Sequence, residues 1–379
     1  MKKKFVFVTG TRADYGKMKP LMQALEADER FELYVFICGM HLSERLGSTY
    51  DEVVRDKYKN TYIAFGIPHT DDASVNLGNT VICFSGYVSN IKPDMIIVHG
   101  DRMDALAGAM VGAQKNIPVA HIEGGELSGT LDESIRHAIT KFAHIHFVST
   151  EEARKRLIQL GEDDKRVYVI GSPDIDIMLS EKLPDIETVK RKYEISFEKY
   201  GILMYHPVTT EFDVIGDNIE KVVNGIIQSG RNCVVIYPND DMGSQIIIRE
   251  YARLRNSDRF RIFPSLRFEY FLTLLKNAEF IIGNSSAGIR EAGIYGVPVI
   301  DVGSRQNGRY DHAAVKNIIH VGEDEGQIIK AINSVDSYRY RSADFGRGDS
   351  TEAFLQIIKK EDFWDIDIQK RFRDLDFCV

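Results

Sequence analysis

Residues 95–125, MIIVHGDRMDALAGAMVGAQKNIPVAHIEGG, hold the pattern that decides the fold. An apolar run at 95–99 is followed by a helix-like stretch at 103–114 and a second apolar run at 118–122. Short apolar runs that alternate with helices are typical of parallel strands buried on both faces. The stretch therefore predicts a strand–helix–strand unit of a parallel α/β sheet.

The same alternation fills the rest of the chain. Further strands are expected at 4–9, 31–38, 145–149 and 167–170, and a second series at 202–205, 233–237, 261–263, 280–282 and 297–302. The polar stretch 180–199 separates the two series. We expect two Rossmann-like, doubly wound parallel-sheet domains, at 1–180 and 200–361, that face each other across a cleft. Apolar residues at roughly helical spacing predict a terminal helix over 362–379, packed back on one domain, with the N-terminal domain as the first candidate.

Composition excludes several classes of protein. The 379 residues are 44% apolar and 27% charged, which is typical of a soluble globular protein, and the formal net charge of −8 argues against nucleic acid or an anionic membrane as partner. The first apolar run ends at Val8, too early for a signal peptide, and no run is long enough to span a membrane. The four cysteines show no CxxC spacing, which indicates reduced thiols and a cytoplasmic location.

Polar residues follow the ends of the expected strands in both domains. The runs end in 9-TGTR, 99-HGDR, 123-EGG, 206-HP, 238-PN and 283-GNSS. Open parallel sheets bind ligands beyond the carboxyl ends of their strands. The placement predicts one ligand site, formed by strand ends of both domains.

The segment 283–303, GNSSAGIREAGIYGVPVIDVG, has two interpretations. Asn284 or Ser285 can cap a helix that runs to about Tyr295, with Gly296 after its end and Pro298 blocking continuation. Alternatively, hydroxyl and backbone N–H groups at the helix start hold a phosphate. Taken singly, Glu291 and His206 also fit either a structural role or a binding role.

The acidic stretch 121–137, HIEGGELSGTLDESIRH, is the other notable segment. Thr130 and Glu133 have the spacing of a capping box, and Asp132 in the same turn suits the helix dipole. Glu123 and Asp101 instead follow two apolar runs, where neighbouring carboxylates can divide acid and base roles. We expect no metal and no ATP or NAD cofactor, since the chain has no HExxH, no Walker A loop and no GxGxxG.

Four motifs together resemble the hydrolysing UDP-N-acetylglucosamine 2-epimerases of sialic-acid biosynthesis. They are HGDRMDALAGA, HIEGGELSGTLDESIRHAITKFAHIH, HPVTTE and GNSSAGIREAGIYGVPVIDVGSRQ. The similarity runs in order from 10-GTRADYGK to about Gln306. It implies a GT-B-like pair of domains and the conversion of UDP-N-acetylglucosamine and water to N-acetylmannosamine and UDP, through elimination of UDP to a glycal and rehydration. By analogy the enzyme is a dimer or tetramer.

The resemblance also implies roles for individual residues. The family's essential acids fall on Asp101, Glu123 and Asp132, and which of them is base and which is acid stays open. The positions that hold UDP fall on a larger set: Arg12, Arg102, His206, Asn239, Ser285, Ser286, Glu291 and Arg305.

Three alternatives remain open. The same core motifs serve a sister epimerase that acts on a UDP-2,4-diacetamido-trideoxy hexose in legionaminic-acid synthesis. A non-hydrolysing epimerase releases UDP-N-acetylmannosamine instead, and a UDP-sugar glycosyltransferase needs an acceptor other than water.

Overall fold

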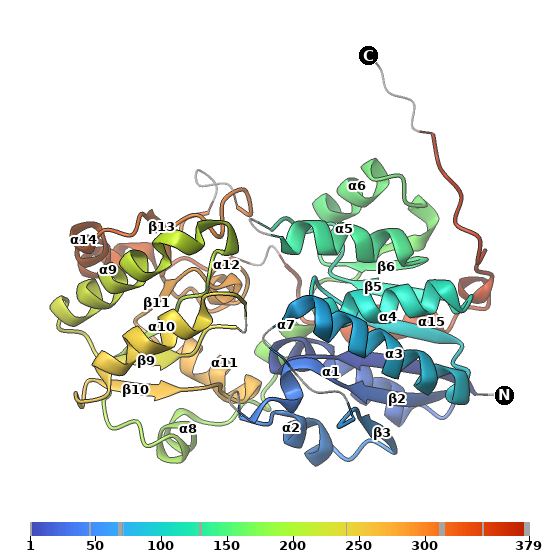
Figure 1. Cartoon of the computed structure of the whole chain (residues 1–379), viewed down its shortest axis with the longest axis horizontal. Coiled ribbons are helices and arrows are strands. Elements are labelled where there is room, and N and C mark those ends of the chain that lie inside the picture. The colour runs from blue at the N-terminus through green and yellow to red at the C-terminus, as the bar shows by residue number, and fades with distance from the viewer. Residues whose placement is uncertain are drawn as a thin grey trace. The chain divides into compact units, whose positions relative to one another are not determined.

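The computed structural model describes residues 2–44, 47–66, 70, 72–128, 131–239, 241–310, 315–342 and 345–374. The chain divides into two compact units. The N-terminal unit comprises residues 1–126, 132–180 and 344–379, and the C-terminal unit comprises residues 127–131 and 181–343. In Figure 1 the N-terminal unit therefore carries both the blue start and the red end of the chain.

The N-terminal unit is built on a parallel sheet, which within the described ranges has seven strands in the order β3-β2-β1-β4-β5-β6-β7. The strands are β1 Lys3–Thr9, β2 Phe31–Ile37, β3 Asn60–Ile63, β4 Met95–His99, β5 Val119–Ile122, β6 Ile145–Val148 and β7 Val167–Val169. The helices are α1 Arg12–Ala27, α2 Tyr50–Arg55, α3 Ala73–Ile91, α4 Met103–Gln114, α5 Asp132–Phe142, α6 Glu151–Gln159, α7 Pro173–Met178 and α15 Ser350–Ile358.

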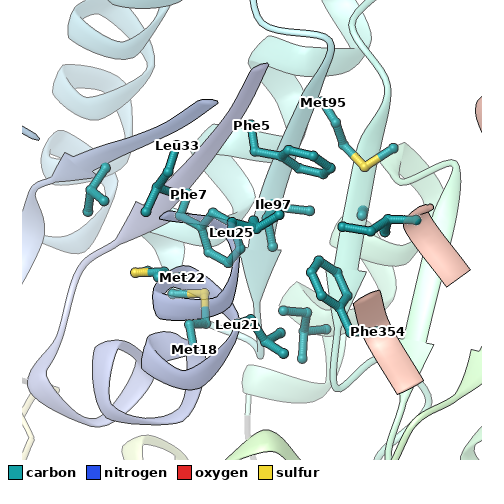
Figure 2. Packing of buried hydrophobic residues seen from close by; sticks show 14 of the residues in the cluster. Phe5, Phe7, Met18, Leu21, Met22, Leu25, Leu33, Met95, Ile97 and Phe354 are labelled. Carbon is teal, nitrogen blue, oxygen red and sulfur yellow. The ribbon is translucent and has the colours of Figure 1, made fainter. Parts of the chain in front are cut away.

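Alternating side chains of β1 explain why both faces of this sheet are covered. Phe5 and Phe7 join a buried cluster with residues of α1 and with Phe354 of α15 (Figure 2). Val6 and Val8 point to the other face, where they join a cluster with residues of α3, α4 and α5. Because successive side chains of a strand alternate between faces, one apolar strand supplies both cores. This is the double winding that the sequence predicts.

The C-terminal unit repeats the architecture with a parallel sheet that, as far as the structure describes it, has six strands in the order β10-β9-β8-β11-β12-β13. The strands are β8 Gly201–Met204, β9 Cys233–Ile236, β10 Phe260–Phe263, β11 Phe280–Gly283, β12 Val299–Val302 and β13 Ile318–Val321. The helices are α8 Ile186–Lys192, α9 Ile215–Gln228, α10 Ser244–Tyr251, α11 Phe268–Lys276, α12 Ser286–Arg290, α13 Ala292–Tyr295 and α14 Glu325–Ser334. Apolar side chains of α9, α10 and α14 share one buried cluster with this sheet. The expected fold class is thereby confirmed.

Two strands were not predicted, and both lie at sheet edges. β3 and β13 each pair with only one neighbouring strand. Their side chains are partly exposed, so neither strand has the long apolar run that marks the central strands. None of the helices in the described ranges is both long and apolar enough to span a membrane.

The end of the chain differs from the prediction. The C-terminal unit ends at residue 343 rather than 361, because Phe354 and Ile358 of α15 are buried in the N-terminal core. The helix expected over 362–379 is absent from the part of that segment that the structure describes, which has only the short 3-10 helix Asp362–Trp364 and continues without regular structure to residue 374. The helical spacing was misleading: Phe363 is buried, whereas Phe372 is 90% exposed.

Candidate active site

The expected carboxylates Asp101 and Glu123 follow two neighbouring strands of the N-terminal sheet. β4 ends at His99, whose backbone pairs in register with Ile122, the last residue of β5. Gly100 then turns the chain with a φ of +73°, and Glu123 has a φ of +63°. Few non-glycine residues adopt this left-handed conformation, and such residues cluster at functional sites. Glu123 is nevertheless only 4% exposed.

Arg136 connects these two strand ends. It lies one turn into α5 and is only 3% exposed. Its Nη1 donates to the Glu123 carbonyl at 2.5 Å, and its Nη2 donates to the Asp101 carboxylate. The third expected acid, Asp132, is the first residue of the same helix. The structure therefore places all three acids in one unit and ties α5 to two of them.

The capping box expected at the start of α5 consists of Thr130 and Glu133, and the structure describes only Glu133. Thr130 lies outside the described residues. The Glu133 carboxylate lies 3.0 Å from His137 Nε2, one turn further along the helix. The prediction for Asp132 itself, catalytic or stabilising the helix start, is untested by this geometry.

The Glu123 side chain lies among buried polar groups that the sequence analysis did not select. Ser172 Oγ donates to Glu123 Oε1 at 2.8 Å. His99 Nε2 lies 3.3 Å from the second carboxylate oxygen, and Lys17 Nζ lies 3.6 Å from the first. Lys17 is also 3.8 Å from the buried Asp174. His99 and Ser172 both follow apolar runs, so the strand-end pattern was a usable signal for them, whereas Lys17 comes from within α1.

Arg12 follows β1 and is the residue at which α1 begins. Thr11 and Asp14 form a capping box at the start of α1, and burial raises the pKa of Asp14 above its usual range. Arg12, the first residue of α1, pairs with Glu52 at 2.6 Å. Burial, together with the Arg12 charge, lowers the pKa of His41 to about 3, so this histidine is neutral. A phosphate that binds Arg12 has to share it with Glu52.

The other expected N-terminal cation, Arg102, lies at the end of β4 beside Asp101. It is the residue before α4, and its Nη2 is 3.8 Å from Met40 Sδ. No group of three or more His, Cys, Asp or Glu side chains in the described ranges is placed to hold a metal ion.

In the C-terminal unit, Asn284 joins several expected UDP-binding residues. Its side chain accepts from His206 N at 2.6 Å and donates to the His206 carbonyl at 2.9 Å. Its own carbonyl accepts from Arg305 Nη1 at 3.1 Å. Asn239 N donates to His206 Nδ1 at 2.9 Å, so the proton of the neutral imidazole resides on Nε2. His206, Asn239 and Arg305 thus gather around the ends of β8, β9, β11 and β12.

The GNSS turn has the predicted cap. Ser285 is the N-cap of α12, and its Oγ accepts from Ala287 N at 3.3 Å. Gly283 has a φ of +130°, and a Cβ there would lie 1.9 Å from the Met204 carbonyl oxygen, so only glycine fits. Ser286 is the first residue of α12, two residues after Asn284.

The predicted helix after this turn is present but interrupted. It consists of α12 and α13, which meet at the buried Glu291, and it ends at Gly296 with the left-handed φ of +69° that its position requires. The capping interpretation of the segment is therefore confirmed at both ends. The phosphate interpretation stays a prediction.

Comparison with known proteins identifies the family. The family model described as UDP-N-acetylglucosamine 2-epimerase matches residues 23–359. A UDP-N-acetylglucosamine 2-epimerase of Neisseria meningitidis is 47% identical over 378 residues, covering 98% of this chain and 99% of the relative. A UDP-N,N'-diacetylbacillosamine 2-epimerase (hydrolyzing) of Legionella pneumophila is 32% identical over 366 residues, covering 95% and 96%.

A solved structure agrees in fold. The Methanocaldococcus jannaschii UDP-GlcNAc 2-epimerase, determined in complex with UDP-GlcNAc and UDP, has a TM-score of 0.80 at 24% identity and covers 94% of this chain and 99% of that chain. Its likeness extends over both parallel-sheet units. With the family model matched over most of the sequence, the chain belongs to the UDP-N-acetylglucosamine 2-epimerase family.

Proposed function

We propose that the protein is a hydrolysing 2-epimerase that converts UDP-N-acetylglucosamine and water to N-acetylmannosamine and UDP, and thereby supplies sialic-acid biosynthesis. The observation that carries the proposal is the setting of Glu123. A buried carboxylate on a left-handed backbone, next to His99 and tied through Arg136 to Asp101, is suited to moving a proton at a weakly acidic carbon.

The reaction needs two steps. A carboxylate removes the proton from sugar carbon 2, a carbon–carbon double bond forms, and the bond from carbon 1 to the diphosphate oxygen breaks, so that UDP leaves with the electron pair. Water then adds across the double bond, with its hydroxyl on carbon 1 and a proton delivered to the opposite face of carbon 2. Asp101, Glu123 and Asp132 are our candidates for these proton transfers. The assignment of base and acid among them stays open.

The C-terminal unit supports a UDP site by its chemistry. We assign the UDP contacts to the residues named from the resemblance, of which His206, Asn239, Ser285, Ser286, Glu291 and Arg305 belong to this unit. His206 Nε2 carries a proton and is therefore a donor, as a diphosphate oxygen requires. Glu291 is a carboxylate acceptor suited to ribose hydroxyls. The guanidinium groups of Arg12, Arg102 and Arg305 would neutralise charge that develops on the departing diphosphate.

The names of two relatives support the substrate and the type of epimerase that we propose. The Neisseria relative, named for UDP-N-acetylglucosamine, is more similar to this chain than the Legionella relative, named for the diacetamido sugar, and this order favours the first substrate. The Legionella name includes hydrolysis, which supports release of free sugar rather than of UDP-N-acetylmannosamine. A glycosyltransferase would need an acceptor, whereas the proposed reaction needs only water.

NMR measurements of turnover on the two candidate substrates separate these possibilities. Purified protein with UDP-N-acetylglucosamine in deuterated water, without added metal or NAD, is expected to release UDP and N-acetylmannosamine with deuterium at carbon 2. Retention of the original hydrogen at carbon 2 would refute the elimination. Release of UDP-N-acetylmannosamine would show a non-hydrolysing enzyme. A much larger kcat/KM for the diacetamido sugar would assign the protein to the alternative pathway.

A further inference from the structure

We propose that Lys370, in the segment that follows the last helix, is a positioning residue for the active site because it caps the C-terminus of α5. This inference rests on the proposed function, since α5 begins with Asp132 and carries Arg136. Residue 370 lies beyond residue 359, where the match to the family model ends.

The Lys370 ammonium group contacts three acceptors at the end of α5. Its Nζ donates to the Thr140 carbonyl at 3.1 Å, to the Ala143 carbonyl at 2.6 Å and to Glu162 Oε2 at 2.5 Å. The last carbonyls of a helix have no partner within the helix and attract a cation. The ammonium has three protons for these three acceptors, so it satisfies the end of α5 as a cap does.

Glu162 fixes the ammonium in place. Its carboxylate is almost completely buried and also lies 3.0 Å from His146 Nε2 and 2.8 Å from Lys141 Nζ. Burial opposes its ionisation, but His146 and the two ammonium groups more than offset that effect and hold the pKa of Glu162 at about 2. Glu162 is therefore charged at neutral pH and holds Lys370 against the helix end.

The neighbouring residues fasten the segment to the same unit. His144 Nδ1 accepts from Val119 N at 3.2 Å, so its Nε2 carries the proton and donates to the Ile368 carbonyl at 3.1 Å. Arg373 pairs at 2.6 Å with Asp163, which lies outside α5. The segment thus lies on the N-terminal unit at several points, and only one of these ion pairs reaches the helix carbonyls.

A chain of hydrogen bonds leads from this cap to Gly100, in the turn that precedes Asp101. His121 Nε2 lies 2.7 Å from the Gly100 carbonyl, which can only accept, so Nε2 carries the proton. Burial lowers the pKa of His121 to about 3, so the ring is neutral and its Nδ1 accepts from Thr140 Oγ1 at 3.2 Å. Thr140 therefore joins the Lys370 cap to Gly100, the residue before Asp101. At the other end of α5, Arg136 holds Asp101 and the Glu123 carbonyl.

Two full-length variants test the proposal. Lys370→Met keeps the side-chain length without the charge, and Arg373→Met is the matched control, since it removes an ion pair of the same segment. We expect Lys370→Met to lower kcat by ~10-fold or more, because small displacements of catalytic groups have large effects on rate. Affinity for free UDP should not change in either variant. Hydrogen exchange of α5 amides should accelerate in Lys370→Met only.

Every other outcome contradicts the inference. Normal kcat with faster exchange in α5 would make Lys370 a stabilising residue only, and equal effects of both variants would mean general loosening of the segment. If Lys370→Met does not fold, Lys370→Met with Glu162→Gln removes the buried charge and the cap together, and the same kcat loss is expected. Should the wild-type protein fail to turn over the UDP-sugar, the proposed function fails, whereas unchanged exchange in α5 would still refute the cap by itself.

Discussion

Arg136→Met offers the sharpest test of the catalytic arrangement. Arg136 is 3% exposed, and the substitution removes its hydrogen bonds to the Glu123 carbonyl and the Asp101 carboxylate. The Asp101 side chain, which is 19% exposed, then loses its contact with the guanidinium group. Removal of one partner of a buried ion pair costs ~3–5 kcal/mol. Because water reaches Asp101, we expect the lower end, a loss of about 3 kcal/mol in the free energy of unfolding.

The chain supplies its own probe for this measurement. Trp364 is the single tryptophan, and its ring packs against Phe5 in the core of the N-terminal unit, at 5.5 Å between centroids. Urea unfolding followed by its fluorescence therefore reports on the unit that contains Arg136. Turnover should fall by ~10²-fold, as for misplaced catalytic groups, while free UDP binds as before.

A double-mutant cycle distinguishes the ion pair from general packing. An Asp101→Asn background lacks the carboxylate that pairs with Arg136, so Arg136→Met should cost less there, with a coupling energy of ~1–3 kcal/mol. Arg136→Lys should recover only part of the stability, since one ammonium does not reproduce the two-pronged guanidinium contact. An equal loss of stability in both backgrounds, or unchanged turnover of Arg136→Met, would refute the argument that Arg136 orders the two strand ends.

Three further predictions concern the candidate acids, the proposed UDP site and Glu162. Asp101→Asn and Glu123→Gln should each lower kcat by ~10²-fold or more with UDP affinity retained, measured by NMR turnover and calorimetry; a loss of UDP affinity instead would place them in the nucleotide site. Ser286→Ala should weaken UDP binding by ~10- to 100-fold, the effect of one hydrogen bond to a charged group, and unchanged affinity in calorimetry would remove Ser286 from the site. Because the pKa of Glu162 is lowered from 4.5 to about 2, its contribution to stability is complete above pH 4.5 and disappears as the pH falls towards 2. Unfolding of Glu162→Gln against wild type, between pH 7 and 2, should show the two stabilities converging at low pH, and a constant difference would contradict this.

The sequence was sufficient for much of the fold because the central strands are apolar without interruption. The runs around Phe5–Val8 and Met95–Val98 are buried on both faces, and such runs are visible without tertiary information. The edge strands β3 and β13 have one partner strand each; β3 has no buried side chain and β13 includes the exposed His320, so neither forms an unbroken buried apolar run. A helix was predicted for the final segment from spacing alone, whereas Phe363 packs into the N-terminal core from a short 3-10 helix.

The candidate site was predictable where a residue follows a strand. Asp101, Glu123 and His206 were selected on that ground, and the structure places each at such an end. The partners of Glu123 were not found, because they meet it only through tertiary structure: Ser172 is 49 residues away. Lys370 is 230 residues from Thr140, a separation over which sequence pattern has no information. Helix positions such as Lys17 carry no local signal that distinguishes them from solvent-exposed lysines.

The backbone of Glu123 shows why its role is better explained by chemistry than by folding. A left-handed φ suits glycine, and the next two residues are glycines, so a glycine at position 123 would form this turn with less strain. A glutamate there has an unfavourable conformation, of order 1–3 kcal/mol, and also places a carboxylate in the interior. Ser172, His99 and Lys17 then stabilise that carboxylate from three other elements. The turn itself does not need this side chain, and the proton transfer that we propose next to Asp101 would give it a function.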